Sequence, residues 1–172
     1  IYKGMSKFFI IGGKKLNGEI EMDCAKNAIL PILAGCILID GEVILHKIPK
    51  YSDVLAMCDI LSGLGAKVEW QGDNLIVNCS CLSDVTVPNE LAGKVRASIF
   101  TLGAILSRQK KAKVSYPGGC AIGLRPIDIH LNGIKSFGGK IVEKNGYIYA
   151  DGQNLKAGDF MLPFASVGAT EN

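Results

Sequence analysis

The sequence lacks any long run of apolar residues. Its longest uninterrupted apolar stretch, residues 28–39, has 12 residues and contains Pro31 and Gly35. A helix that spans a bilayer needs about 20 such residues, so this stretch predicts a buried helix instead. The first residues also lack the pattern of a secretory signal peptide. These absences favour a cytoplasmic protein without a membrane partner.

The sequence also lacks a dense run of charged residues and a set of residues spaced to bind a metal ion. The net charge is only +3, and the nearest approach to a basic run, residues 109–113, is typical of a solvated loop. The sequence therefore does not indicate nucleic-acid binding. Cys79 and Cys81 form an isolated C-x-C with neither histidine nearby in the sequence, so no metal site is predicted. Most of the six cysteines lie in apolar segments, as in a reduced protein.

What the chain does contain is an internal repeat. With 172 residues, 48% of them apolar, it is long enough for one domain with a core. The first unit predicts a helix from near Cys24, a strand at 43–46, a helix beginning at a capping Ser52 or Asp53, and strands at 66–70 and 74–79. The second predicts a helix at 92–108, a strand at 113–116, a helix at 126–137, and strands at 140–143 and 147–150.

Glycines mark corresponding points of the two units. Gly65 and Gly138 end the second helix of each unit and are 73 residues apart. A third unit opens at Ser166, and residues 7–11 and 18–22 predict two further strands. Because the apolar helices of such units must be buried against their sheets, the pattern predicts an α/β fold made of α+β repeats.

A glycine-rich segment, residues 117–130, interrupts the second unit. It sets Cys120 between glycines and close to Arg125, whose planar guanidinium suits phosphate or carboxylate. A thiol near fixed positive charge is biased toward its reactive form. The residues alone leave two interpretations open, a reactive loop cysteine or a cysteine that only fills space in a turn.

Motifs along the whole chain resemble, in order, those of one known family. They are GGKKLNG at residues 12–18, AKNA at 25–28, LGAKV at 64–68, VRASI at 95–99, the cysteine segment at 117–130 and SVGATEN at 166–172. The series is far more specific than any single motif. By this resemblance the chain is identified as a member of the UDP-N-acetylglucosamine 1-carboxyvinyltransferases, also called UDP-N-acetylglucosamine enolpyruvyl transferases (MurA).

The resemblance implies the enolpyruvyl transferase fold, an inside-out α/β barrel of repeated β-α-β-α-β-β units with helices inside and sheets outside. Residues 24–172 would form two units and the start of a third of the first domain. Residues 5–23 would supply strands that belong partly to the second, missing domain, and residues 1–4, before Met5, would lie outside the fold. The chain is therefore expected to be a fragment with about half of an active site.

The same resemblance implies an activity, transfer of the enolpyruvyl group of phosphoenolpyruvate to the 3-hydroxyl of UDP-N-acetylglucosamine with release of phosphate. This is the first committed step of peptidoglycan synthesis. Addition and then elimination need an acid near the methylene carbon, a base near the sugar hydroxyl, and cations around the anionic groups. Cys120 would be the proton donor, the site of a covalent phosphoenolpyruvate adduct and the residue that fosfomycin alkylates. The base would be an aspartate in the missing portion, and no cofactor is implied.

Binding residues follow from the matched motifs. Phosphoenolpyruvate would be held by Lys26, Asn27 and Arg125. UDP-N-acetylglucosamine would be bound by Asn27, Arg96, Arg125, Pro126, Ile127, Asp128, Ile129, Ser166, Val167 and Gly168. Some members carry lysine where this chain has Phe164. Without the family, Lys26 would be a lysine extending from a buried helix, either arginine a surface ion-pair partner, and His130 has no derived role.

Two other functions are compatible with parts of the sequence. A 5-enolpyruvylshikimate-3-phosphate synthase would share the repeat and the donor but use a shikimate phosphate acceptor. The cysteine segment and residues 125–128 argue against it. A catalytically silent paralogue would bind without turnover, and the intact Lys26–Asn27 pair weighs against that.

Overall fold

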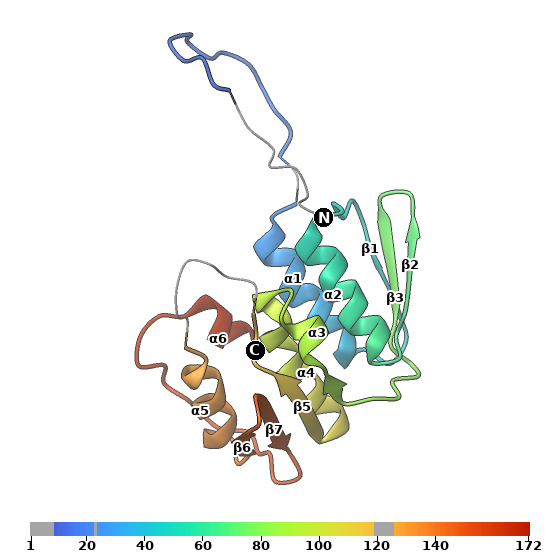
Figure 1. Ribbon diagram of the computed structural model, residues 1–172, viewed down its shortest axis with the longest axis vertical. Coiled ribbons are helices and arrows are strands. Elements are labelled where there is room, and N and C mark those ends of the chain that lie inside the picture. The colour runs from blue at the N-terminus through green and yellow to red at the C-terminus, as the bar shows by residue number, and fades with distance from the viewer. Residues whose placement is uncertain (1–8, 23, 119–125) are drawn as a thin grey trace.

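The computed structural model describes residues 9–22, 24–118 and 126–172 and contains two successive helix-and-sheet units (Figure 1). The first unit comprises α1 (Lys26–Gly35), η1 (Cys36–Leu38), β1 (Glu42–Leu45), α2 (Ser52–Gly63), β2 (Lys67–Gln71) and β3 (Asn74–Asn78). The second comprises β4 (Thr86–Val87), α3 (Asn89–Ala92), η2 (Arg96–Ile99), α4 (Phe100–Gln109), β5 (Lys111–Ser115), α5 (Asp128–Ser136), β6 (Lys140–Lys144) and β7 (Tyr147–Asp151). A last helix, α6 (Val167–Glu171), follows.

The strand order confirms the repeat. The first sheet has the order β1-β3-β2 and is antiparallel throughout. The second contains β5-β7-β6 in the equivalent antiparallel order, and β4 adds a short parallel strand beside β5. The registers also correspond, because Asn78 pairs with Glu42 and Lys67, and Asp151 pairs with Lys111 and Lys140.

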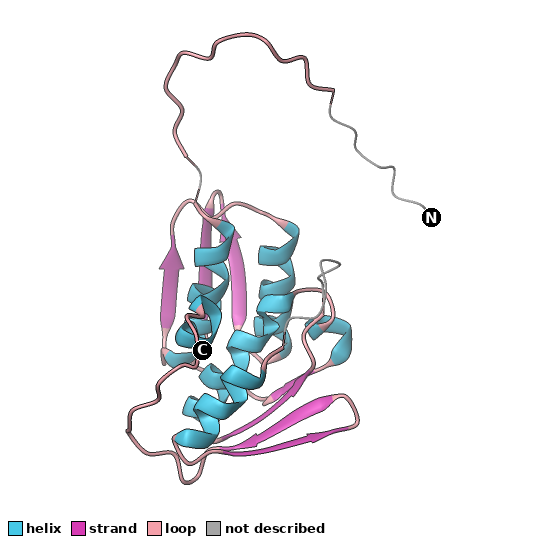
Figure 2. Cartoon of the chain, turned by 90° about the vertical axis from the view of Figure 1, so that its left-hand side faces the viewer, coloured by secondary structure: helices cyan, strands magenta, loops and turns pink. Residues whose placement is uncertain are grey.

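The helices lie between the two sheets. Figure 2 shows the sheets on different sides of the helices, and α1 packs against both α2 and α4. The residues of α4 from Thr101 to Leu106 are all buried, as are Leu75 and Val77 of the central strand of the first sheet. Helices inside and sheets outside is the predicted arrangement, and closure into a barrel by further units remains a prediction.

Positive φ angles occur at the predicted turns. Gly65 (φ 99°) follows α2, and Gly138 (φ 91°) follows α5. A Cβ at Gly65 would lie 2.6 Å from the Oγ of Ser83, so the close approach as well as the backbone angle requires glycine. The β6–β7 hairpin turns at Asn145 (φ 53°) and Gly146 (φ 76°), as the dipeptide predicts.

The N-terminal segment is predicted to contain two strands, at 7–11 and 18–22, of which residues 7 and 8 lie outside the described part of the chain. The described part of this segment, residues 9–22, contains neither helix nor strand, and it extends away from the folded body (Figure 1). Its apolar side chains Phe9, Ile11 and Leu16 are exposed. Residues 9–22 therefore form no strand in this chain, in which they have no neighbouring strand to pair with, and their pairing with a second domain stays a prediction.

Two helix starts also differ from the prediction. The single helix expected over residues 92–108 is divided into α3, η2 and α4, because Val95 takes an extended conformation and buries its side chain. Neither Ser52 nor Asp53 caps α2. The residue before that helix is Tyr51, so both polar residues lie in the first turn.

No helix among the described residues is long and apolar enough to cross a membrane. Nor does the part of the chain that the structure describes contain a group of three or more histidine, cysteine or acidic side chains able to hold a metal ion.

Arg108, near the end of α4, joins the second unit to the first. Its guanidinium donates to the backbone carbonyls of Ile37 (2.8 Å) and Ile39 (3.0 Å) and to the carboxylate of Asp40 (3.2 Å). These carbonyls lie where the α1–η1 helical segment ends, and such terminal carbonyls have no partner within the helix. The planar fork of arginine reaches several acceptors at once, which a lysine cannot do in the same way.

We expect Arg108→Leu to lower the free energy of unfolding by about 2 kcal/mol, because the variant leaves a half-buried carbonyl without its donor. Urea denaturation measures this change. Lys94→Met, which breaks the exposed ion pair between Lys94 and Asp59, is the control and should stay within about 0.5 kcal/mol of the wild type. Equal losses in both variants would contradict a specific role for Arg108.

Candidate functional site

A pocket of about 870 Å³ opens where five separate segments meet. It lies at the start of α1, beside the start of α2, along η2 and the start of α4, and against α5 and α6. Its lining residues are Ala25, Lys26, Asn27, Ala28, Leu30, Asp53, Val95, Arg96, Ala97, Ile99, Phe100, Pro126, Ile129, His130, Phe164, Ser166, Val167, Gly168 and Glu171. This volume is in the range of small-molecule sites.

The start of α1 gives the pocket a positive end. Lys26 and Asn27 are the first two residues of this helix, and no described side chain caps it. The first backbone N–H groups of a helix have no partner within it and, with the helix dipole, favour an anion. The first turn of α1 contains no acidic residue. A phosphate or carboxylate would therefore meet both backbone donors and the Lys26 ammonium here.

Lys26 also contacts an acidic residue of the next helix. Its Nζ lies 2.7 Å from the Oδ2 of Asp53, in the first turn of α2. Both side chains line the pocket. The lysine therefore does not merely extend into solvent from a buried helix.

The pocket is also lined by Arg96 and His130. Burial lowers the pKa of the His130 imidazole below its usual range, and the nearby Arg96 guanidinium lowers it further. Asp128 opposes this shift. His130 is consequently neutral at pH 7, whereas Arg96 is a permanent cation in the lining.

The last residues of the chain complete the pocket. Ser166 caps α6 by accepting a hydrogen bond from the backbone N–H of Ala169 (3.3 Å). Asn172 bonds to two other elements, accepting from the backbone N–H of Gly103 (3.1 Å) and pairing with the Nδ1 of His130 (3.1 Å). A Cβ at Gly103 would lie 2.2 Å from the carbonyl oxygen of Asn172, so only glycine permits this approach.

Most of the described residues predicted to bind substrate meet in this pocket. The lining includes Lys26, Asn27, Arg96, Pro126, Ile129, Ser166, Val167 and Gly168. Ile127 is buried and Asp128 is exposed, and neither belongs to the lining. Cys120 and Arg125 lie outside the described residues.

Sequence reasoning missed three polar residues of the lining, Asp53, His130 and Glu171. Asp53 was read only as a possible helix cap, and its contact with Lys26 spans 27 positions of sequence. His130 was given no role, yet its side chain is only 9% exposed and lines the pocket. A signal for His130 was available, because it lies two residues after Asp128 within the cysteine segment. No local signal relates Asp53 to Lys26.

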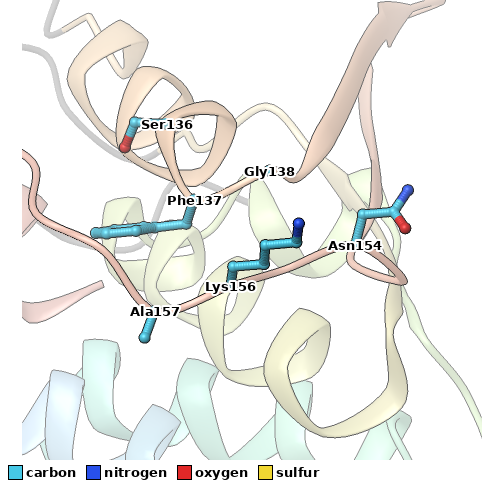
Figure 3. Close-up of a pocket in the computed structure, with 6 residues that line it drawn as sticks. All are labelled: Ser136, Phe137, Gly138, Asn154, Lys156 and Ala157. Carbon is cyan, nitrogen blue, oxygen red and sulfur yellow. The ribbon is translucent and has the colours of Figure 1, made fainter.

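A second hollow of about 380 Å³ lies at the end of α5. Figure 3 shows the Lys156 side chain between the end of this helix and Asn154. The backbone N–H of Lys156 donates to the carbonyl of Phe137 (2.8 Å). A cation near the carboxyl end of a helix is favourable in itself. This hollow gathers one charged side chain, whereas the larger pocket gathers several, so the larger pocket is the candidate site.

Three of the described cysteines are buried in the core and are not candidates for a reactive thiol. Burial raises the pKa of the Cys36 and Cys58 thiols to about 11 and also raises that of Cys79. These thiols are therefore protonated and poorly nucleophilic at neutral pH.

The fold is that of the enolpyruvyl transferases. The chain is similar to the enolpyruvyl transferase NikO from Streptomyces tendae, with a TM-score of 0.69 and 21% identity over 84% of this chain and 32% of that one. It is also similar to an EPSP synthase from Acinetobacter baumannii, with a TM-score of 0.65 and 15% identity over 90% of this chain and 36% of that one.

Sequence comparison defines the family. Residues 10–172 match the family described as EPSP synthase (3-phosphoshikimate 1-carboxyvinyltransferase), and the chain belongs to this family. It is 46% identical over 168 residues to UDP-N-acetylglucosamine 1-carboxyvinyltransferase 2 of Caldanaerobacter subterraneus, and 44% identical over 169 residues to UDP-N-acetylglucosamine 1-carboxyvinyltransferase of Gluconobacter oxydans. Each match covers 98% of this chain, which spans about 40% of the length of these relatives.

The lowered pKa of His130 predicts a pH dependence of stability. Below pH 6.5 the unfolded histidine takes up a proton that the folded one resists, so folding becomes less favourable as the pH falls through and below this value. The slope of the unfolding free energy reaches at most about 1.4 kcal/mol per pH unit. Urea denaturation between pH 7.5 and 5 measures it.

His130→Gln should flatten this slope, because it removes the group whose pKa is lowered on folding. An unchanged slope in His130→Gln would show that other groups cause the pH dependence.

Proposed function

We propose that the protein transfers the carboxyvinyl (enolpyruvyl) group of phosphoenolpyruvate to the 3-hydroxyl of UDP-N-acetylglucosamine. The observation that carries this proposal is the pocket, in which Lys26, Asn27, Arg96 and residues 166–168 meet from three distant segments. Those positions match the motifs on which the resemblance rests. The names of the curated relatives, at 40–46% identity, support UDP-N-acetylglucosamine as the acceptor.

The charges of the pocket suit the two anionic substrates. Phosphoenolpyruvate brings a phosphate and a carboxylate, for which the Lys26 ammonium and the start of α1 are donors. Arg96, which also lines the pocket, would face the diphosphate of the sugar nucleotide. In the reaction the 3-hydroxyl oxygen bonds to C2 of phosphoenolpyruvate, its proton passing to a base, as C3 gains a proton from an acid. The tetrahedral adduct then loses a proton from C3 and inorganic phosphate, which restores the double bond.

Cys120 is proposed as the proton donor, with Arg125 as a phosphoenolpyruvate contact. Support comes from the residues on each side of the undescribed segment. The backbone N–H of Gly118 donates to the carbonyl of Ala92 (3.1 Å), and Pro126 lines the pocket. The proposed nucleotide contacts are Arg96, residues 125–129 and residues 166–168.

The rest of the catalytic site would come from the additional length that the relatives possess. We propose that residues 24–172 form part of the first domain and that residues 5–23 pair as strands with the second. The exposed apolar side chains of the N-terminal segment support this pairing. The catalytic base would lie in that second portion. The reaction would serve peptidoglycan synthesis in the cytoplasm.

The acceptor separates this proposal from a shikimate phosphate enzyme. We expect the full-length protein to release phosphate from phosphoenolpyruvate with UDP-N-acetylglucosamine and not with shikimate 3-phosphate. The 172-residue chain alone should show little or no turnover, because the base is proposed to lie elsewhere. Phosphate release assayed with each acceptor decides between the two, and turnover with shikimate 3-phosphate alone would refute the proposal.

Cys120 is tested by fosfomycin labelling in the full-length protein. We expect peptide-resolved mass spectrometry to find an adduct at Cys120 that depends on UDP-N-acetylglucosamine. Cys120→Asp should retain turnover without the adduct, since a carboxyl group can supply the proton. Cys81→Ser, which removes an exposed cysteine, is the control and should label normally. Labelling that persists in Cys120→Asp would locate the reactive thiol elsewhere.

A further inference from the structure

The ion pair between Lys26 and Asp53 lies in the wall of the candidate site. The distance from Nζ to Oδ2 is 2.7 Å, which is that of a short charge-assisted hydrogen bond. Of the ion pairs that join described residues, this is the one with both partners in the pocket lining. The proposed phosphoenolpyruvate ligand therefore has a defined anionic neighbour.

Stability does not account for this pair. The side chains of Lys26 and Asp53 are 46% and 31% exposed, and ion pairs with such access to water contribute little to folding. Asp53 also lies in the first turn of α2, where the helix dipole favours a carboxylate whether or not a lysine is nearby. The main effect of the contact is therefore to fix the position of the Lys26 ammonium.

A contact that fixes the charged group matters more for a lysine than for an arginine. Its ammonium is a compact charge on a flexible four-carbon stem and has three N–H donors. One donor goes to Asp53, which leaves two for a ligand. Asp53 belongs to α2, which packs side by side with α1 (Figure 1). A carboxylate on this neighbouring helix therefore fixes the lysine at the start of α1 before any substrate arrives.

We propose that Asp53 is a positioning residue for phosphoenolpyruvate binding, acting through Lys26. The inference rests on the proposed function and adds a residue to it. Prior ordering of the ammonium removes part of the entropy cost of binding. If Asp53 acted only through its negative charge, its removal would strengthen phosphoenolpyruvate binding, because a carboxylate repels an anion bound beside it. The direction of the change in affinity therefore separates the two roles.

The experiment compares Asp53→Ala and Asp53→Glu in the full-length protein. We expect Asp53→Ala to raise KM for phosphoenolpyruvate about tenfold, while KM for UDP-N-acetylglucosamine stays within about twofold. Asp53→Glu should recover part of the loss. Equilibrium dialysis with phosphoenolpyruvate measures the same weakening without turnover. Asp59→Ala is the matched control, since it breaks the Lys94–Asp59 pair on the same helix outside the pocket and should change neither constant.

A double-mutant cycle tests whether Asp53 acts through Lys26. In a Lys26→Ala background, Asp53→Ala should have no further effect on phosphoenolpyruvate affinity. Tighter binding in Asp53→Ala, an equal loss in Asp59→Ala, or an undiminished loss in the Lys26→Ala background would each overturn the proposal. Absence of carboxyvinyl transfer in the wild type would refute the proposed function alone, because dialysis still reports on the role of Asp53.

Discussion

The middle of helix α4 is buried on every side, and neighbouring elements are arranged to cover it. The six consecutive buried residues from Thr101 to Leu106 are more than one helical face can supply, so this part of the helix has no side open to water. Helix α1, the η1 turn, β5 and β7 all contact it. Burying a single leucine side chain is worth about 2 kcal/mol, so exposing this helix would be costly. The two repeat units must therefore stay together.

The same constraint decides where chemistry can occur. The buried faces of these helices are almost wholly apolar, and the charged residues that line the pocket lie at or near helix ends. Lys26 is the first residue of α1, Asp53 the second of α2, and Arg96 the first of η2. Because these ends converge on one pocket, a core that is almost wholly apolar produces a polar site beside it. The unpaired backbone N–H groups at the start of α1 add to the positive character of the site.

The sequence predicted the fold well where the signal was local. Apolar spacing and the glycines at 65 and 138 predicted both units, and Asn145 with Gly146 predicted the last hairpin. Motifs likewise singled out Lys26, Asn27 and Arg96, which line the pocket, and their roles in binding stay predictions. The features that the sequence did not predict depend on residues far apart in the chain. The break at Val95 depends on core packing, pairing of the N-terminal segment depends on a partner sheet, and the contact between Asp53 and Lys26 depends on two helices being neighbours.

Asn172 also determines the tautomer of His130. The backbone N–H of Gly103 can only donate, so the Asn172 atom that it contacts must be the amide oxygen. The amide nitrogen then faces His130 and donates to Nδ1, which must carry a lone pair. The single proton of the neutral imidazole consequently resides on Nε2. A backbone hydrogen bond on α4 thus selects, through one amide, which ring nitrogen of α5 is a donor and which is an acceptor.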